Sequence, residues 1–206
     1  MFIYFNFLII LLFTAQIHHA GKGNKDKIIV DSHYTLSQAL EGKEIPHTNT
    51  KNLKIVDVEY FSFDHRLHKG QVVIHKDLAD DIIEIFELIK EKQFPVRKVV
   101  PVNVYNWSDE ASMKDNNTSA FNYRFVSGTR TFSAHSLGRA IDINPFQNPQ
   151  MKNGKTSPEG AVYNKHAHGT ISKESWLTRE FYKRGWRWGG NWNSLKDYQH
   201  FEKTKL

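Results

Sequence analysis

Residues 133–145 constrain the fold of this chain more than any other stretch. Asp142 lies in the apolar run Ala140-Ile141-Asp142-Ile143, which is typical of a buried strand. Burying a carboxylate is costly unless a positive partner meets it. We expect a metal ion, because His135 precedes the bend at Gly138 and can fold back onto the same side of the strand. One imidazole nitrogen and one carboxylate oxygen suit zinc.

A third ligand is available near the end of the chain. In the segment Asp197-Tyr198-Gln199-His200-Phe201-Glu202, a carboxylate stands three residues before His200. Two histidines and one aspartate leave the fourth position of a tetrahedral zinc ion to water, which is typical of a catalytic rather than a structural site. The sequence therefore predicts one Zn²⁺ per chain, bound by His135, Asp142 and His200.

These residues carry a resemblance to a known family. The pattern Ser-x-His-x-x-Gly-x-Ala-x-Asp at residues 133–142, followed by Asp-x-x-His-Phe-Glu at 197–202, resembles the zinc peptidases of the D-alanyl-D-alanine carboxypeptidase group. That group includes VanY-like carboxypeptidases and L-alanyl-D-glutamate endopeptidases, and the resemblance covers roughly residues 99–202. It implies a peptidase that acts on peptidoglycan stem peptides, as a carboxypeptidase or alternatively as an endopeptidase. It also implies a fold like that of these metallopeptidases and of hedgehog-type domains.

The resemblance further implies roles for residues around the metal. A peptidase of this kind needs a base for the attacking water and a positive group for the developing oxyanion. Asp197 is the candidate base, where close relatives carry Glu, and Glu202 is a weaker candidate or an outer partner of a ligand imidazole. Arg124 is the candidate oxyanion or substrate-carboxylate partner. Ser133 and Trp192, together with Arg124, are the candidate substrate-binding residues.

Several of these residues also have an alternative role that involves no catalysis or metal binding. Arg130 is an alternative to Arg124, and Arg124 could instead form a surface ion pair. His166 and His168 lie in a turn-rich loop, where histidines more often face solvent or substrate than bind a second metal. A zinc-containing binding domain without turnover, as in hedgehog-type domains, is the alternative to an enzyme.

The first residues predict export. Residues 1–20 contain an apolar run from Phe2 to Ile17, which is short for a membrane span and suits a signal peptide. A buried N-terminal element and an uncleaved membrane anchor are the alternatives, and the anchor is the only membrane association that we expect. Residues 21–52 form a polar lead-in, and residues 53–206 form a single domain. We expect a monomer that works in the periplasm or cell envelope or is secreted.

Composition narrows the choice of partners. With 28 Lys and Arg against 22 Asp and Glu, the net charge is +6, which favours attraction to polyanions such as those of the bacterial envelope. Nucleic acid is not expected, because the basic residues are spread along the chain without aromatic interleaving. The chain has no Cys, so neither disulfides nor a Cys-ligated zinc ion can contribute.

Periodicity predicts a small α+β fold. We expect a central antiparallel sheet that carries Asp142 and His200, with helices packed on one side. The reason is that the predicted short strands do not alternate with helices, as they would in a parallel βαβ fold. We expect residues 53–63 to pair with residues 71–75, and we expect two further strands at 96–105 and 120–126. The predicted helices are residues 76–93 and 172–184. Residues 108–119 should form a polar loop that contains a helical turn.

Overall fold

The computed structural model describes residues 27–204. The predicted signal peptide at residues 1–20 lies outside this range. Among the described residues, no helix has the length and apolar character needed to cross a membrane.

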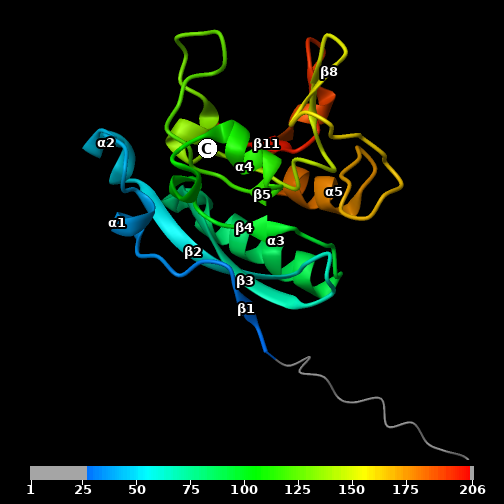
Figure 1. Ribbon diagram of the computed structural model, residues 1–206, viewed down its shortest axis with the longest axis horizontal. Helices are drawn as coiled ribbons and strands as arrows, with labels where there is room; N and C mark the ends of the chain where they lie inside the picture. Colours follow the sequence, from blue (N-terminus) through cyan, green and yellow to red (C-terminus); the bar gives the residue numbers. More distant parts are fainter. Residues whose placement is uncertain (1–26, 205–206) are drawn as a thin grey trace, which may run out of the picture.

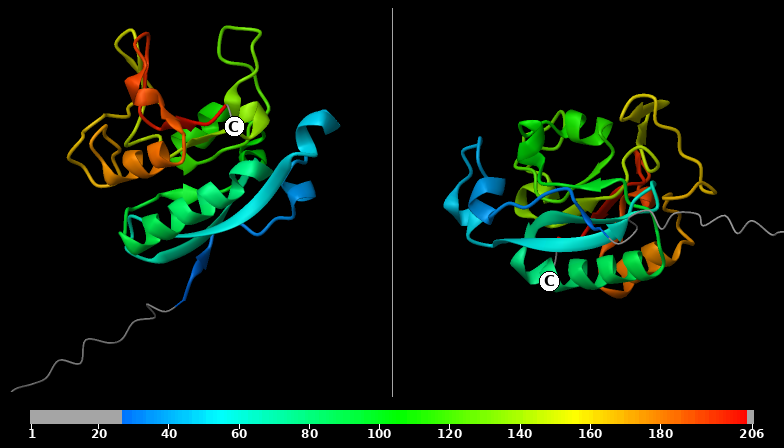
Figure 2. Two further views of the ribbon diagram at one scale, coloured as in Figure 1. Left: turned by 180° about the vertical axis from the view of Figure 1, so that it is seen from behind. Right: turned by 60° about the horizontal axis from the view of Figure 1, so that its bottom comes forward.

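The lower layer in Figure 1 is a long hairpin covered by a helix. Strands β2 (Leu53–Phe61) and β3 (Leu67–His75) pair in antiparallel fashion, and β1 (Ile29–Val30) joins the edge of β3 in parallel. Helix α3 (Ala79–Glu91) lies across the hairpin (Figure 2) and follows the 3₁₀ turn η1 (Lys76–Leu78). Its buried residues recur every three or four positions, which is the spacing of one helix face.

The upper layer holds two small antiparallel sheets. In the first, β6 (Ala140–Asp142) and β9 (Arg187–Trp188) flank β11 (His200–Glu202). In the second, β10 (Lys196–Asp197) and β8 (Lys155–Ser157) flank β7 (Gln150–Lys152). Only Tyr198 and Gln199 separate β10 from β11, so the two sheets meet at that connection.

Short elements complete the described chain. They are α1 (Leu36–Ala39), α2 (His47–Thr50), β4 (Lys98–Val99), η2 (Val102–Tyr105), α4 (Asp109–Lys114), β5 (Asn117–Thr118), η3 (Ala134–Leu137), α5 (Trp176–Lys183) and η4 (Gly189–Asn191).

One apolar core joins the layers. The buried face of α3 and the inner residues of the hairpin belong to the same cluster as Ile141, Phe181 and Phe201. Phe201 of β11 stacks on Phe181 of α5 with ring centroids 3.8 Å apart. The strand that presents His200 is therefore anchored by the next residue in the chain, whose side chain points to the opposite face.

The predicted α+β class is confirmed, but the sheet differs from the prediction. Instead of one central antiparallel sheet, the described residues form four small sheets, and the pairs β1–β3 and β4–β5 are parallel. The predicted hairpin is present, although Gly70 lies inside β3 and not before it. A Cβ on Gly70 would lie 2.1 Å from the Val99 carbonyl oxygen, so the glycine allows another segment to cross the strand closely.

Two strand predictions are wrong. Within residues 96–105 only β4 is a strand, because the chain turns into η2 after Pro101. Residues 120–126 form no strand beyond a single bridge at Phe125. Their backbone groups bond to separate segments, including Phe121 N–H to Val73 O and Asn122 N–H to His135 O, so no ladder can form.

Candidate metal centre and catalytic cleft

The three predicted ligands come from elements that the local sequence brings together. His135 lies in η3, where the Ser133 hydroxyl accepts a hydrogen bond from His135 N–H. The turn ends at Gly138, whose φ is +62° and whose added Cβ would lie 2.6 Å from His75 N. Only glycine suits this bend. The chain then enters β6, where Asp142 stands directly opposite His200 of β11.

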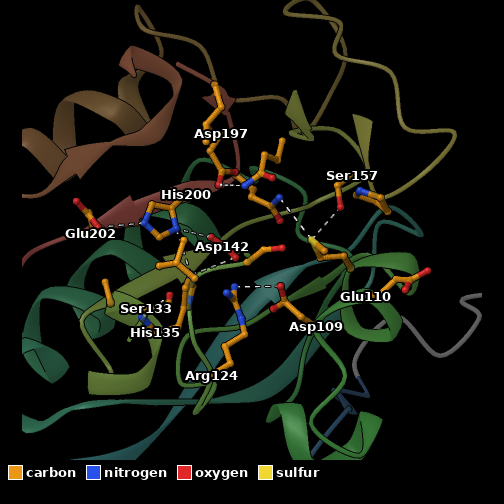
Figure 3. Close-up of a pocket in the computed structure, with 18 of the residues that line it drawn as sticks. Asp109, Glu110, Arg124, Ser133, His135, Asp142, Ser157, Asp197, His200 and Glu202 are labelled. Atoms are coloured by element: carbon orange, nitrogen blue, oxygen red, sulfur yellow. Dashed lines mark hydrogen bonds and ion pairs between the residues drawn. The ribbon is translucent and has the colours of Figure 1, made fainter. Parts of the chain in front are cut away.

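These side chains converge on one buried point (Figure 3). His135 Nε2 lies 3.2 Å from Asp142 Oδ2, and His200 Nδ1 lies 2.9 Å from Asp142 Oδ1. His135 Nε2 and His200 Nδ1 are 3.1 Å apart. All three residues are buried, and each offers one ligand atom within 4.8 Å of the others. Within the described chain this is the one group of three such residues.

The outward nitrogens of both imidazoles already have partners. His135 Nδ1 donates to the Ala120 carbonyl, and His200 Nε2 donates to Glu202 Oε2 at 3.4 Å. A neutral imidazole that donates through one nitrogen presents a lone pair on the other. The two inward nitrogens would then face each other as acceptors beside a carboxylate, an arrangement that a cation stabilises. This donor set fits zinc.

The acid–base properties of the centre agree with a site for positive charge. Burial would lower the pKa of His200, but its hydrogen bonds to Asp142 and Glu202 and their charges raise it to about 10. Burial would likewise raise the pKa of Asp142, but the charges and hydrogen bonds of His135 and His200 hold it far below its usual range. The carboxylates that raise the pKa of His200 would equally stabilise a bound cation at this point.

Asp197 lies beside this centre on the neighbouring sheet. Its Oδ2 accepts a hydrogen bond from Gln150 Nε2 at 2.8 Å, across the β7–β10 pair. Its Oδ1 is buried without a hydrogen-bond partner. Burial raises the pKa of Asp197 to about 6; the charge of Asp142 also raises it, while His200 lowers it. Asp197 therefore offers a buried acceptor with a pKa suited to proton transfer near neutral pH.

Gly189 holds Asp197 close to the metal centre. A Cβ at this position would lie 2.7 Å from the Asp197 carbonyl oxygen, 2.9 Å from Asp197 Cβ and 3.2 Å from His200 Cβ. The neighbouring Gly190 lies against the ring of Trp188 in the same way. Gly189 thus lets the chain pack directly against Asp197 and His200, and Gly190 lets it pack against Trp188.

The predicted substrate-binding residues line the same cleft. Arg124 Nη2 forms an ion pair with Asp109 Oδ2 at 3.0 Å, and its Nε is buried without a partner. Its backbone N–H is held by Ser136 Oγ at 2.8 Å. Trp192 lies over the imidazole of His200 with ring centroids 5.1 Å apart. Ser133 caps η3, as described above, and also lines the cleft.

Residues 127–203 match the family model of the D-alanyl-D-alanine carboxypeptidases. The predicted family resemblance is confirmed. The matched segment contains His135, Asp142, Asp197 and His200, whereas Arg124 precedes it. Comparisons with curated proteins and with solved structures found no match.

The cleft beside the candidate metal centre has a volume of about 580 Å³. Its lining is acidic, whereas the whole sequence carries a net charge of +6. Arg124 is the single arginine or lysine among its described lining residues. The lining carboxylates are Asp109, Glu110, Asp142, Glu159, Asp197 and Glu202. A bound dication would offset part of this negative charge.

Sequence reasoning missed several partners of the site. Asp109, which pairs with Arg124, and Gln150, which orients Asp197, belong to segments without any motif. The Ala120 carbonyl, which accepts a hydrogen bond from His135 Nδ1–H, could not be recognised from residue type at all. His166 and His168 are exposed and do not line the cleft, so the structure does not bring them to the candidate metal centre.

Proposed function

We propose that this chain is a zinc-dependent peptidoglycan peptidase that hydrolyses a peptide bond in the cell-wall stem peptide. The observation that carries the proposal is the buried His135–Asp142–His200 cluster beside the unpartnered Oδ1 of Asp197, inside a segment that matches a peptidase family. Within this activity we propose a D-alanyl-D-alanine carboxypeptidase, with an L-alanyl-D-glutamate endopeptidase as the alternative.

We assign three of the site residues to metal binding and Asp197 to proton transfer. His135 Nε2, one Asp142 oxygen and His200 Nδ1 would hold the ion, and zinc bound there would supply Lewis-acid polarisation of the scissile carbonyl and of water. Asp197 Oδ1 takes the proton of the attacking water, because it is a buried carboxylate oxygen that lines the cleft and lacks a hydrogen-bond partner. The same carboxyl group, once protonated, can deliver that proton to the leaving amine.

Arg124 supplies the remaining positive charge. We propose that its guanidinium stabilises the oxyanion or binds the terminal carboxylate of the substrate, while Asp109 keeps it oriented. We propose export as the route by which the enzyme meets its substrate, since peptidoglycan lies outside the cytoplasmic membrane. This rests on the apolar run at residues 2–17.

The products of purified stem pentapeptides decide between the two specificities. Mass spectrometry should detect free D-alanine and a shortened peptide if the enzyme is a carboxypeptidase. Internal cleavage after L-alanine, without release of D-alanine, would identify the endopeptidase. A His200→Ala variant, which lacks one proposed ligand, serves as the control for contaminating peptidases and should release neither product.

A further inference from the structure

The arm formed by residues 123–133 carries an aromatic stack that has no part in the proposed mechanism. Phe132 lies between Tyr123 and Phe125, with ring centroids 5.1 Å and 4.4 Å away and interplanar angles of 27° and 24°. The arm projects from the upper layer in Figures 1 and 2, opposite the arm that contains β7 and β8. The cleft lies between residues of both arms.

The backbone of the arm is closed into a hairpin. Ser133 N–H donates to Arg124 O at 3.1 Å, and Val126 N–H donates to Thr131 O at 2.8 Å. Thr129 N–H and its hydroxyl both donate to the Val126 carbonyl. These bonds fix the two ends of the arm, so the rings that it carries form a preorganised surface and lose little freedom on binding a ligand.

Two rings of the stack and the neighbouring Val126 are open to solvent. Phe125, Phe132 and Val126 are 49%, 46% and 43% exposed. Grouped exposed apolar side chains of this kind mark interaction sites. Phe125 and Val126 line the cleft, whereas Tyr123 and Phe132 do not. Phe125 is therefore the end of the stack that faces the cleft, with Phe132 supporting its other face.

The chemistry around the rings favours a sugar over a membrane. The tip of the arm, Ser127-Gly128-Thr129-Arg130-Thr131, is polar, whereas a segment that enters a lipid surface places apolar side chains at its leading edge. A pyranose ring has an apolar C–H face and a rim of hydroxyls. An aromatic face can cover the first while nearby hydroxyls and an arginine can bond the second.

We propose that Phe125 stacks against a sugar of the glycan strand that carries the stem peptide, and so selects peptide that is still attached to glycan. This inference rests on the proposed function, because it places the glycan strand next to a cleft that holds the stem peptide. The arm would bind the glycan while the metal centre acts on the peptide beyond it.

The test compares one stem peptide in two forms, free and linked to its disaccharide. Phe125→Ala should raise KM for the disaccharide-linked peptide about tenfold more than KM for the free peptide, a ratio that corresponds to about 1.4 kcal/mol. Phe125→Tyr should keep the wild-type ratio because the ring face remains. Val162→Ala removes an apolar side chain that is 75% exposed and lies outside the cleft, and it should change neither KM.

Direct binding separates this inference from the proposed function. Peptide-free glycan strands should sediment with wild-type protein and about tenfold less with Phe125→Ala, even if wild-type protein cleaves no stem peptide. Equal increases of KM for both peptide forms would instead assign Phe125 to the peptide and overturn the inference. The inference would also be overturned if wild-type protein bound anionic phospholipid vesicles but did not bind peptide-free glycan.

Discussion

Each imidazole of the candidate centre donates its outward proton to a defined acceptor, the Ala120 carbonyl for His135 and Glu202 for His200. This arrangement aims the remaining lone pairs at one point beside Asp142, so the side-chain network itself selects a cation. The ligands could be predicted because all three lie in two short motifs. The acceptors could not, since a backbone carbonyl carries no sequence signal.

Asp197→Asn tests the proposed base. The amide can still bond to Gln150 but cannot take a proton, so peptide hydrolysis should fall by about 10²- to 10⁴-fold. Zinc content, measured by atomic absorption, should stay near one ion per chain. Asp57→Asn changes a carboxylate that pairs with Lys69 away from the cleft, and it should leave hydrolysis unchanged. A nearly active Asp197→Asn protein would mean that Asp197 is not the base.

The pH dependence of hydrolysis follows from the same carboxyl group. Burial raises the pKa of Asp197 to about 6, and a bound dication would lower it because it favours the charged form. A base acts only when deprotonated, so kcat/KM should rise with pH and reach half its plateau at or below about pH 6. Zinc content measured at each pH separates this effect from loss of the metal. A rate that falls as pH rises from 5 to 7 would contradict the assignment.

At the scale of elements, the site depends on the meeting of two small sheets. β11 and β6 hold the ligands His200 and Asp142, while β10 and β7 hold and orient Asp197. Only two residues, Tyr198 and Gln199, separate β10 from β11. The helix α3 was predictable because its apolar residues follow one helical face over many positions. Residues 120–126 were mispredicted as a strand, since their β-type composition does not reveal that their backbone partners lie in unrelated segments.

Gly189→Ala tests whether η4 sets the distance between base and metal centre. The new Cβ would lie within 2.9 Å of Asp197 atoms and 3.2 Å from His200 Cβ, so one or both residues must move. A misplacement of about 1 Å between reacting groups can lower a rate by about 10²-fold, so kcat/KM should fall by up to that factor. Gly154→Ala strains its own turn, where φ is +73°, but its Cβ would meet no atom within 4 Å, so it controls for a glycine replacement that costs stability without touching the site. Equal kcat/KM for Gly189→Ala and Gly154→Ala would show that the close approach is not needed.

At the scale of the whole molecule, the charge of the cleft is opposite in sign to the net charge of the sequence, and one apolar core supports the cleft from beneath. The sequence carries +6 overall, yet six carboxylates and one arginine line the cleft. Net charge therefore bears on long-range attraction to polyanions, while the side chains that line the cleft determine what is bound at the metal centre. Beneath the cleft, the buried face of α3 and the rings of Phe181 and Phe201 belong to one core, which gives the strand carrying His200 a rigid support. Chain order alone could not predict this, because the core joins residues from distant segments.

Zinc-dependent cleavage of a stem peptide tests the central claim most directly. Purified protein is stripped with a chelator, reloaded with a measured amount of Zn²⁺, and incubated with stem pentapeptide under mass-spectrometric detection. Cleavage of one peptide bond should be lost in the stripped protein and return in proportion to zinc, reaching its plateau at one ion per chain, while His200→Ala protein should neither retain zinc nor cleave. If protein that carries one zinc ion per chain leaves both free and glycan-linked stem peptides intact, the centre binds metal without peptidase activity and the account is wrong.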